Sequence, residues 1–151
     1  MILKSYEIQK NKSNLSKYNF FLLYGENFGL KKDIKEYIEI EIKKKDKHIE
    51  ISSLYENDIL KNEENFFNSI FSGSLFSEKK IIIIHESTDK IINNVTNIYN
   101  KYVENVYLIF FSDVLEKKSK LRNFFEMDIK TLCIPCYLDT NRDLESIANI
   151  E

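Results

Sequence analysis

The sequence predicts an α/β fold with a five-stranded, mostly parallel sheet flanked by helices. Short apolar segments recur along the chain, and the first four are each followed by a longer segment with apolar residues at helical spacing. A helix between two strands returns the chain to the same end of the sheet, so successive strands run parallel through right-handed crossovers. No internal repeat or linker interrupts this alternation over 151 residues, the size of one domain. We therefore expect a single domain, residues 1–151.

Five segments are predicted as strands. Residues 20–24 are an unbroken aromatic and aliphatic run, and residues 106–111 are the strongest run of this kind. Residues 81–84 are four consecutive isoleucines, a pattern typical of a strand buried on both faces. Residues 47–51 alternate between apolar and polar positions, which indicates an edge strand, and residues 129–133 form the last strand. The two most apolar later strands, 81–84 and 106–111, are therefore expected at the centre of the sheet.

Five segments are predicted as helices, because their apolar residues recur at intervals of three and four among polar ones. These are residues 28–42, 54–72, 89–103, 117–125 and 144–150. The last helix runs almost to the end of the sequence without a polar tail. We therefore expect this domain to be the N-terminal part of a longer protein.

The composition is that of an ordinary globular protein, with 43% hydrophobic and 30% charged residues. The net charge of -2 provides no overall basic field for nucleic acid. Met1 is followed by polar residues within a few positions, and no apolar run reaches the length of a membrane span. Two cysteines near the C-terminal end give no disulfide framework. These features favour a cytoplasmic location without a membrane partner.

The turn after residues 20–24 has the context of a phosphate-binding loop without its chemistry. A working loop has the pattern G-x-x-x-x-G-K-[ST], in which backbone amides and the lysine hold phosphates and the hydroxyl holds magnesium. After Gly25, the second glycine, Gly29, comes one residue early, and Lys31 and Lys32 follow it without a Ser or Thr. We predict a degenerate, non-functional loop that binds no cofactor. The alternative, a nucleotide-binding domain or NTPase with an unusual loop, predicts saturable ATP binding through Lys31 or Lys32.

Two further motifs give weak functional signals. The isoleucine strand ends in His85-Glu86, where an ATPase has Asp-Glu, and a neutral imidazole is a poor magnesium ligand. Cys133 and Cys136 form a C-x-x-C motif, but they follow the last strand instead of starting a long helix, where a thiol would be activated. A thiol-redox protein with a Cys133–Cys136 disulfide remains an alternative. No other catalytic set of residues stands out.

Three basic groups lie at residues 43–47, 79–80 and 117–122. Lysines at the end of a helix complement the helix dipole, so the first group is expected to be a solvated helix end. The third group is expected to open a helix, where cations are unfavourable, which indicates a phosphate or an acidic partner.

The segment Ser74-Leu75-Phe76-Ser77 precedes the isoleucine strand. Its Leu-Phe pair lies between serines and charges, in a short connection expected at the surface. Such a pair is either a satellite of the core or a hydrophobic plug that inserts into a partner. If Leu75 and Phe76 are core, replacing both with alanine should cost several kcal/mol of stability.

Three motifs in order, Leu22 to Glu26, Ser74 to Ile81 and Leu115 to Leu121, resemble those of the delta subunit of the bacterial DNA polymerase III clamp loader. The resemblance is to the N-terminal domain of that family and extends over nearly the whole chain. It implies an AAA+ fold that has lost nucleotide binding. It also implies that Leu75 and Phe76, framed by Ser74 and Ser77, insert into a pocket of the ring-shaped sliding clamp and help to open it.

The resemblance further implies a non-catalytic subunit of the DNA polymerase III holoenzyme, a DNA-directed DNA polymerase and nucleotidyltransferase. Its partners would be the sliding clamp (beta) and the gamma/tau and delta prime subunits, with DNA contacted within the full loader. Ile70 and Phe71 would supply the packing that supports the Leu-Phe pair. Members of the family continue into a helical lid and a collar domain that joins the other subunits, and this sequence contains neither.

Overall fold

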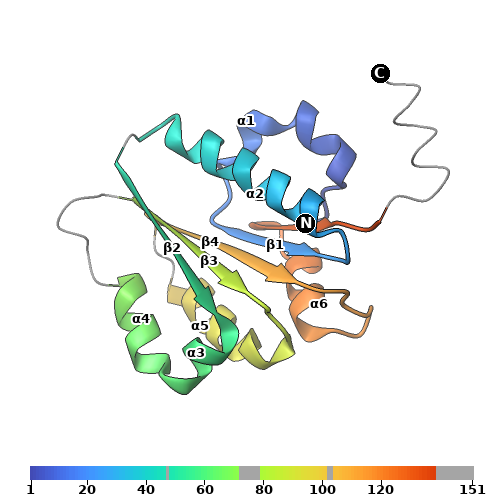
Figure 1. Cartoon of the computed structure of the whole chain (residues 1–151). Helices are drawn as coiled ribbons and strands as arrows, with labels where there is room; N and C mark the ends of the chain where they lie inside the picture. Colours follow the sequence, from blue (N-terminus) through green and yellow to red (C-terminus); the bar gives the residue numbers. More distant parts are fainter. Residues whose placement is uncertain (47, 72–78, 102–103, 139–151) are drawn as a thin grey trace.

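The computed structural model describes residues 1–46, 48–71, 79–101 and 104–138. A five-stranded sheet with the order β2-β3-β4-β1-β5 forms its centre, and every strand pair is parallel (Figure 1). The strands are β1 (Phe20–Tyr24), β2 (Ile49–Tyr55), β3 (Lys79–His85), β4 (Val106–Ser112) and β5 (Thr131–Pro135). The predicted α/β class and parallel sheet are therefore confirmed.

Helices cover both faces of this sheet (Figure 1). On one face lie η1 (Ser5–Lys10), α1 (Lys12–Leu15) and α2 (Phe28–Lys43). On the other face lie α3 (Glu56–Lys61), α4 (Glu63–Phe71), η2 (Asp89–Ile91), α5 (Ile92–Lys101) and α6 (Lys120–Met127). Within the described part of the chain, no helix combines the length and apolar character needed to cross a membrane.

Several predicted boundaries were wrong. The segment 54–72 was predicted as one helix, but β2 continues to Tyr55 and the helix is divided into α3 and α4 at Asn62. The last strand begins two residues later than predicted, and α6 begins at Lys120 instead of residue 117. The predicted helix 144–150 lies outside the described residues.

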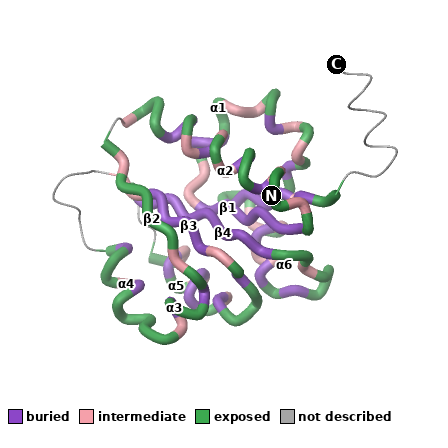
Figure 2. The backbone as a smooth tube through the Cα atoms, viewed as in Figure 1, coloured by how far each residue is buried: buried purple, intermediate pink, exposed green. Residues whose placement is uncertain are grey.

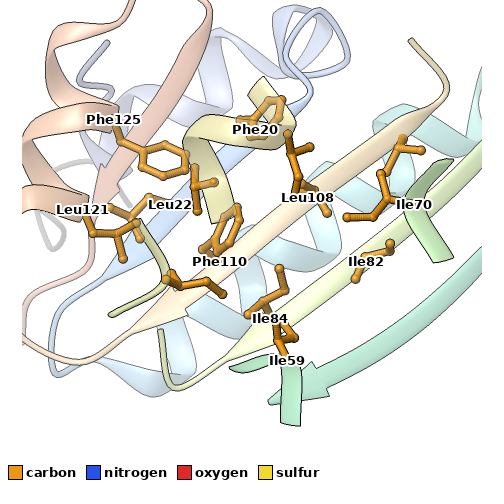
Figure 3. Packing of buried hydrophobic residues seen from close by; sticks show 14 of the residues in the cluster. Phe20, Leu22, Ile59, Ile70, Ile82, Ile84, Leu108, Phe110, Leu121 and Phe125 are labelled. Carbon is orange, nitrogen blue, oxygen red and sulfur yellow. The ribbon is translucent and has the colours of Figure 1, made fainter. Parts of the chain in front are cut away.

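Successive side chains of a strand point to opposite faces of the sheet, and helices cover both faces. The central strands therefore contribute side chains to the core on both faces. Every residue of β1 and β4 is buried, whereas the edge strand β2 is largely exposed (Figure 2). Figure 3 shows the face covered by α3 to α6, where Leu22, Ile82 and Phe110 point toward the helices. The rings of Phe110 in β4 and Phe125 in α6 pack edge to face, with 5.6 Å between their centroids. The predicted central position of β3 and β4 is confirmed.

All five strands run in the same direction, so their first residues lie along one side of the sheet and their last residues along the opposite side. We call the side where the strands begin the amino edge and the side where they end the carboxyl edge; neither term refers to the edge strands β2 and β5. The turn at Gly25 follows β1 and therefore lies at the carboxyl edge. Lys79, the first residue of β3, lies at the amino edge.

A buried carboxylate, Glu56, joins the start of α3 to the connection after β3. It accepts hydrogen bonds from the amide of Thr88 at 2.7 Å and from the hydroxyl of Thr88 at 2.8 Å. Glu56 is 4% exposed. Without the Glu56 carboxylate, the amide and the hydroxyl of Thr88 would both lose their acceptor.

We expect Glu56→Ala to lower the free energy of unfolding by about 1–3 kcal/mol, because two hydrogen bonds to a buried, charged acceptor are lost. Denaturant titration of the variant and the wild type measures this difference. Asp58→Ala is the matched control, because Asp58 lies in the same helix and is exposed. Equal losses in both variants would contradict the role of Glu56.

Candidate functional site

The degenerate loop at the carboxyl edge is closed by the end of β5. Gly25 has a φ of 122°, and a Cβ at this position would lie 2.1 Å from the carbonyl oxygen of Cys136. Only glycine fits there, since it tolerates the positive φ and has no side chain to collide with the neighbouring backbone. The amide of Gly25 donates to the carbonyl of Asp113 at 3.2 Å. Glycine at this position therefore allows the backbone of the turn after β1 to pack directly against the backbone that follows β5.

The residues after β5 continue across the loop and use its polar groups. The amide of Cys136 donates to the carbonyl of Tyr24 at 2.6 Å, and the amide of Asn27 donates to the carbonyl of Cys136 at 3.0 Å. The side-chain amide of Asn27 donates to the carbonyl of Tyr137 at 3.3 Å. Its side-chain oxygen accepts from the amide of Leu30 at 3.1 Å and so caps α2. We call residues 136–138 the strap.

Glu26 completes the attachment of the strap. Its carboxylate accepts a hydrogen bond from the amide of Leu138 at 3.0 Å. This bond lowers the pKa of Glu26, and a bond from the residue's own amide lowers it further. The loop therefore carries a fixed negative charge, which would repel a phosphate group. That the loop is non-functional stays a prediction.

The two lysines of the degenerate loop have different positions. Lys31 is 4% exposed, and its ammonium group donates to the carbonyl of Ser112 at 3.0 Å. The same group lies 3.9 Å from the carboxylate of Asp113. Lys32 is exposed. Gly29 lies in the first turn of α2, where a Cβ would lie 3.8 Å from the side-chain oxygen of Asn27, an ordinary van der Waals distance. Lys31 thus joins α2 to the end of β4, an internal role.

His85 and Glu86 do not form a metal site. The imidazole of His85 lies 5.3 Å from the ring of Tyr55 and 5.3 Å from the ring of Phe111. Burial lowers the pKa of His85, nearby Lys35 lowers it further, and Glu86 acts in the opposite direction. Among the described residues, no group of histidine, cysteine or acidic side chains could hold a metal ion. His85 is a neutral aromatic contact between strands.

The two cysteines point to opposite faces of the sheet. Cys133 belongs to the core face covered by α3 to α6, whereas Cys136 belongs to the face covered by α2. Both thiols are buried, and burial raises the pKa of each to about 12. A thiol that remains protonated at neutral pH is a poor nucleophile. This arrangement weighs against the thiol-redox alternative.

The basic group at residues 117–122 spans the start of α6, where Asp89 supplies a negative charge from within the chain. Asp89 accepts hydrogen bonds from the hydroxyl of Ser119 at 2.6 Å and from the amide of Leu121 at 3.0 Å. Burial raises the pKa of Asp89, but these bonds outweigh it, so that the net shift is downward. Arg122 is held by Glu126, by the carbonyl of Leu115 and by the ring of Tyr24. The carboxylate of Asp89 therefore already supplies the charge that favours this helix end.

The predicted clamp-binding residues, Ser74, Leu75, Phe76 and Ser77, lie outside the described residues. The chain reaches them from Phe71, the last residue of α4, and continues at Lys79, the first residue of β3. Lys79 is paired in register with Ile49, where β2 begins. Ile70 is 2% exposed, whereas Phe71 is 40% exposed. The packing of both residues against the Leu-Phe pair stays a prediction, because the pair lies outside the described residues.

The burial of both thiols predicts slow reaction with external reagents. Cys133 and Cys136 should react with an aromatic disulfide reagent at pH 8 at least about a hundredfold more slowly in the folded protein than in denaturant. The reason is the pKa of about 12, which leaves little thiolate. Mass spectrometry after mild oxidation should show no intramolecular disulfide. Fast reaction of the folded protein, or formation of the disulfide, would contradict these positions.

No protein-family model matches the sequence, and no curated protein matches it. Among solved structures, the Bacillus subtilis DNA clamp loader delta protein (YqeN) is similar to this chain, with a TM-score of 0.67 and 10% sequence identity. The similarity covers 95% of this chain and 45% of that protein. The chain thus spans less than half the length of the protein it matches. This chain therefore shares the fold of the matching part of a clamp-loader delta protein, as the resemblance of its motifs predicted.

Proposed function

We propose that this chain is the N-terminal domain of a clamp-loader delta subunit, which binds the ring-shaped sliding clamp of the bacterial replicative polymerase and helps to open it. The observation that carries the proposal is the similarity in fold to a clamp loader delta protein over 95% of the chain. In this proposal, Leu75 and Phe76 insert into a pocket of the clamp, and Ser74 and Ser77 flank them. The domain itself catalyses no reaction.

The proposed contact has sufficient energy for this role. Burying a leucine or phenylalanine side chain contributes about 1.5–3 kcal/mol, so the pair contributes roughly 3–6 kcal/mol before ordering costs. A hot spot of this size can anchor a small interface. It is also comparable to the roughly 5.5 kcal/mol of differential binding that converts a minor state of a partner into its major state. Clamp opening in this proposal therefore needs binding energy from this subunit, and no ATP hydrolysis by it.

The whole subunit would work as one component of the DNA polymerase III holoenzyme in the cytoplasm. The gamma/tau and delta prime subunits would join it through parts of the protein beyond this domain, in agreement with the 45% coverage of the similar protein. DNA would be contacted only within the full loader, where the exposed Lys117, Lys118 and Lys120 are available.

The alternative, a nucleotide-binding domain, has less support from the carboxyl edge. The loop amides of Gly25, Asn27 and Leu30 have acceptors within the chain. Glu26 adds a negative charge, and Lys31 is directed to the end of β4. A phosphate would have to displace the strap before it could reach these groups.

The first test is binding to a purified bacterial sliding clamp by isothermal titration or surface plasmon resonance. The double variant Leu75→Ala/Phe76→Ala should weaken binding about a hundredfold or more, because about 3 kcal/mol of burial is lost. Its melting temperature should remain close to that of the wild type. The matched control is Met127→Ala/Ile129→Ala, a pair of exposed apolar residues on other elements, which should bind normally. A wild type that does not bind, or a double variant that merely unfolds, would contradict the proposal.

A second test measures ATP binding in the presence of magnesium. We expect no saturable binding at millimolar ATP. Lys31→Met should lower the free energy of unfolding by about 1.5–3 kcal/mol, because a buried charged hydrogen bond to Ser112 is lost. Lys32→Met should leave stability unchanged, since Lys32 is exposed. Saturable ATP binding that Lys31→Met abolishes would instead support the nucleotide-binding alternative.

A further inference from the structure

Phe71 is an exposed aromatic residue whose ring is held by packing against the ring of Phe67. It ends α4 and is 40% exposed. Its ring lies parallel to the ring of Phe67, with an angle of 9° and 6.3 Å between centroids. Phe67 packs against the core and meets the ring of Phe66, which is buried, at 5.9 Å. A row of three rings thus extends from the core to the surface and holds Phe71 in place.

A positive charge accompanies this ring. The ammonium group of Lys101 lies 5.5 Å from the centroid of the Phe71 ring, within the range of a cation–π interaction. Lys101 ends α5 and is exposed. The ends of α4 and α5 therefore come together at one place and present an aromatic ring and a cation side by side.

The backbone around this place is also fixed. The ammonium group of Lys80 donates to the carbonyl of Ser69 at 2.9 Å, which joins the start of β3 to the last turn of α4. The amide of Lys80 donates to the carbonyl of Asn105 at 2.9 Å, just before β4. The surface formed by Phe71 and Lys101 thus lies at the amino edge of the sheet and rests on three elements.

A partner that covers Leu75 would also reach Phe71. Leu75 follows Phe71 by four positions, so the two Cα atoms are at most about 14 Å apart even in a fully extended chain. A standard interface covers about 800 Å² on each partner, or roughly 28 Å across if it is compact. Phe71 is therefore close enough to Leu75 to lie within an interface of this size that is centred near the Leu-Phe pair.

We propose that Phe71 and Lys101 form a second contact to the sliding clamp, beside the Leu75–Phe76 pair; this inference rests on the proposed function. Phe71 would lie against an apolar part of the clamp surface, and Lys101 would face a carboxylate next to it. Because the ring is held in place before binding, little conformational entropy is lost on association.

The test compares variants of the domain in binding to a purified bacterial sliding clamp. Phe71→Ala should weaken binding about tenfold, since the exposed part of the ring loses its apolar contact. Lys101→Glu should weaken binding severalfold, and its effect should become smaller as the salt concentration rises. Thermal melts of each variant accompany the binding measurements. Lys101→Glu keeps the test decisive if Phe71→Ala lowers the melting temperature, because Lys101 is exposed.

Two matched controls separate this surface from general effects. Phe28→Ala removes a more exposed phenylalanine, 66% accessible, at the carboxyl edge. Lys12→Glu reverses a lysine that lies 4.7 Å from the ring centroid of Tyr37 on the other face of the sheet. Both controls should bind the clamp with unchanged affinity.

The outcomes distinguish this inference from the proposed function. Loss of binding in Leu75→Ala/Phe76→Ala with normal binding in both Phe71→Ala and Lys101→Glu would overturn the second contact and leave the proposed function intact. A wild-type domain that does not bind the clamp would overturn both. Weaker binding in Phe71→Ala and Lys101→Glu, with unchanged controls, is the expected result.

Discussion

The contact between the strap and the turn at Gly25 is the constraint on which the arrangement of this domain depends. The carbonyl of Cys136 occupies the space where any other residue at position 25 would have its Cβ. The same short segment accepts from the amide of Asn27 and donates to Glu26. The turn, the start of α2 and the end of β5 are therefore built against one another. A nucleotide would have to compete with covalently attached groups whose effective concentration is high.

This constraint distinguishes the carboxyl edge, where the chain itself occupies the loop at Gly25, from the amino edge, where we propose that the clamp binds. At the carboxyl edge, Lys31 and Asp89 are engaged by groups of the chain itself. At the amino edge, α4 ends in an exposed ring and the connection to β3 begins. An α/β domain usually binds its ligand at the carboxyl ends of its strands. We infer that this domain has kept the sheet as a rigid support and binds its partner at the opposite edge.

The sheet could be predicted from the sequence because local patterns determine it. Residues 81–84 of β3 and 106–111 of β4 are apolar at every position, a pattern typical of strands in the centre of a parallel sheet. The contacts of the degenerate loop could not be predicted. Cys136 is far from Gly25 in the sequence, and nothing around either residue indicates that their backbones meet. The division at Asn62 was missed because Ile59 and Phe66, on either side of it, are seven positions apart and so stay in helical phase, although residues 61–65 are all polar. The exposure of Phe71 could not be predicted, because its spacing places it on the same helical face as Phe67.

Binding at the amino edge is measured most directly by an NMR titration of the labelled domain with a bacterial sliding clamp, read residue by residue from the backbone amide signals. We predict that signals at the end of α4, the start of β3 and the end of α5 change or broaden, while those of residues 25–32 and 113–119 stay in place. Changes confined to the loop at Gly25, or no changes at all, would contradict the claim that this domain binds its partner through the amino edge of its sheet.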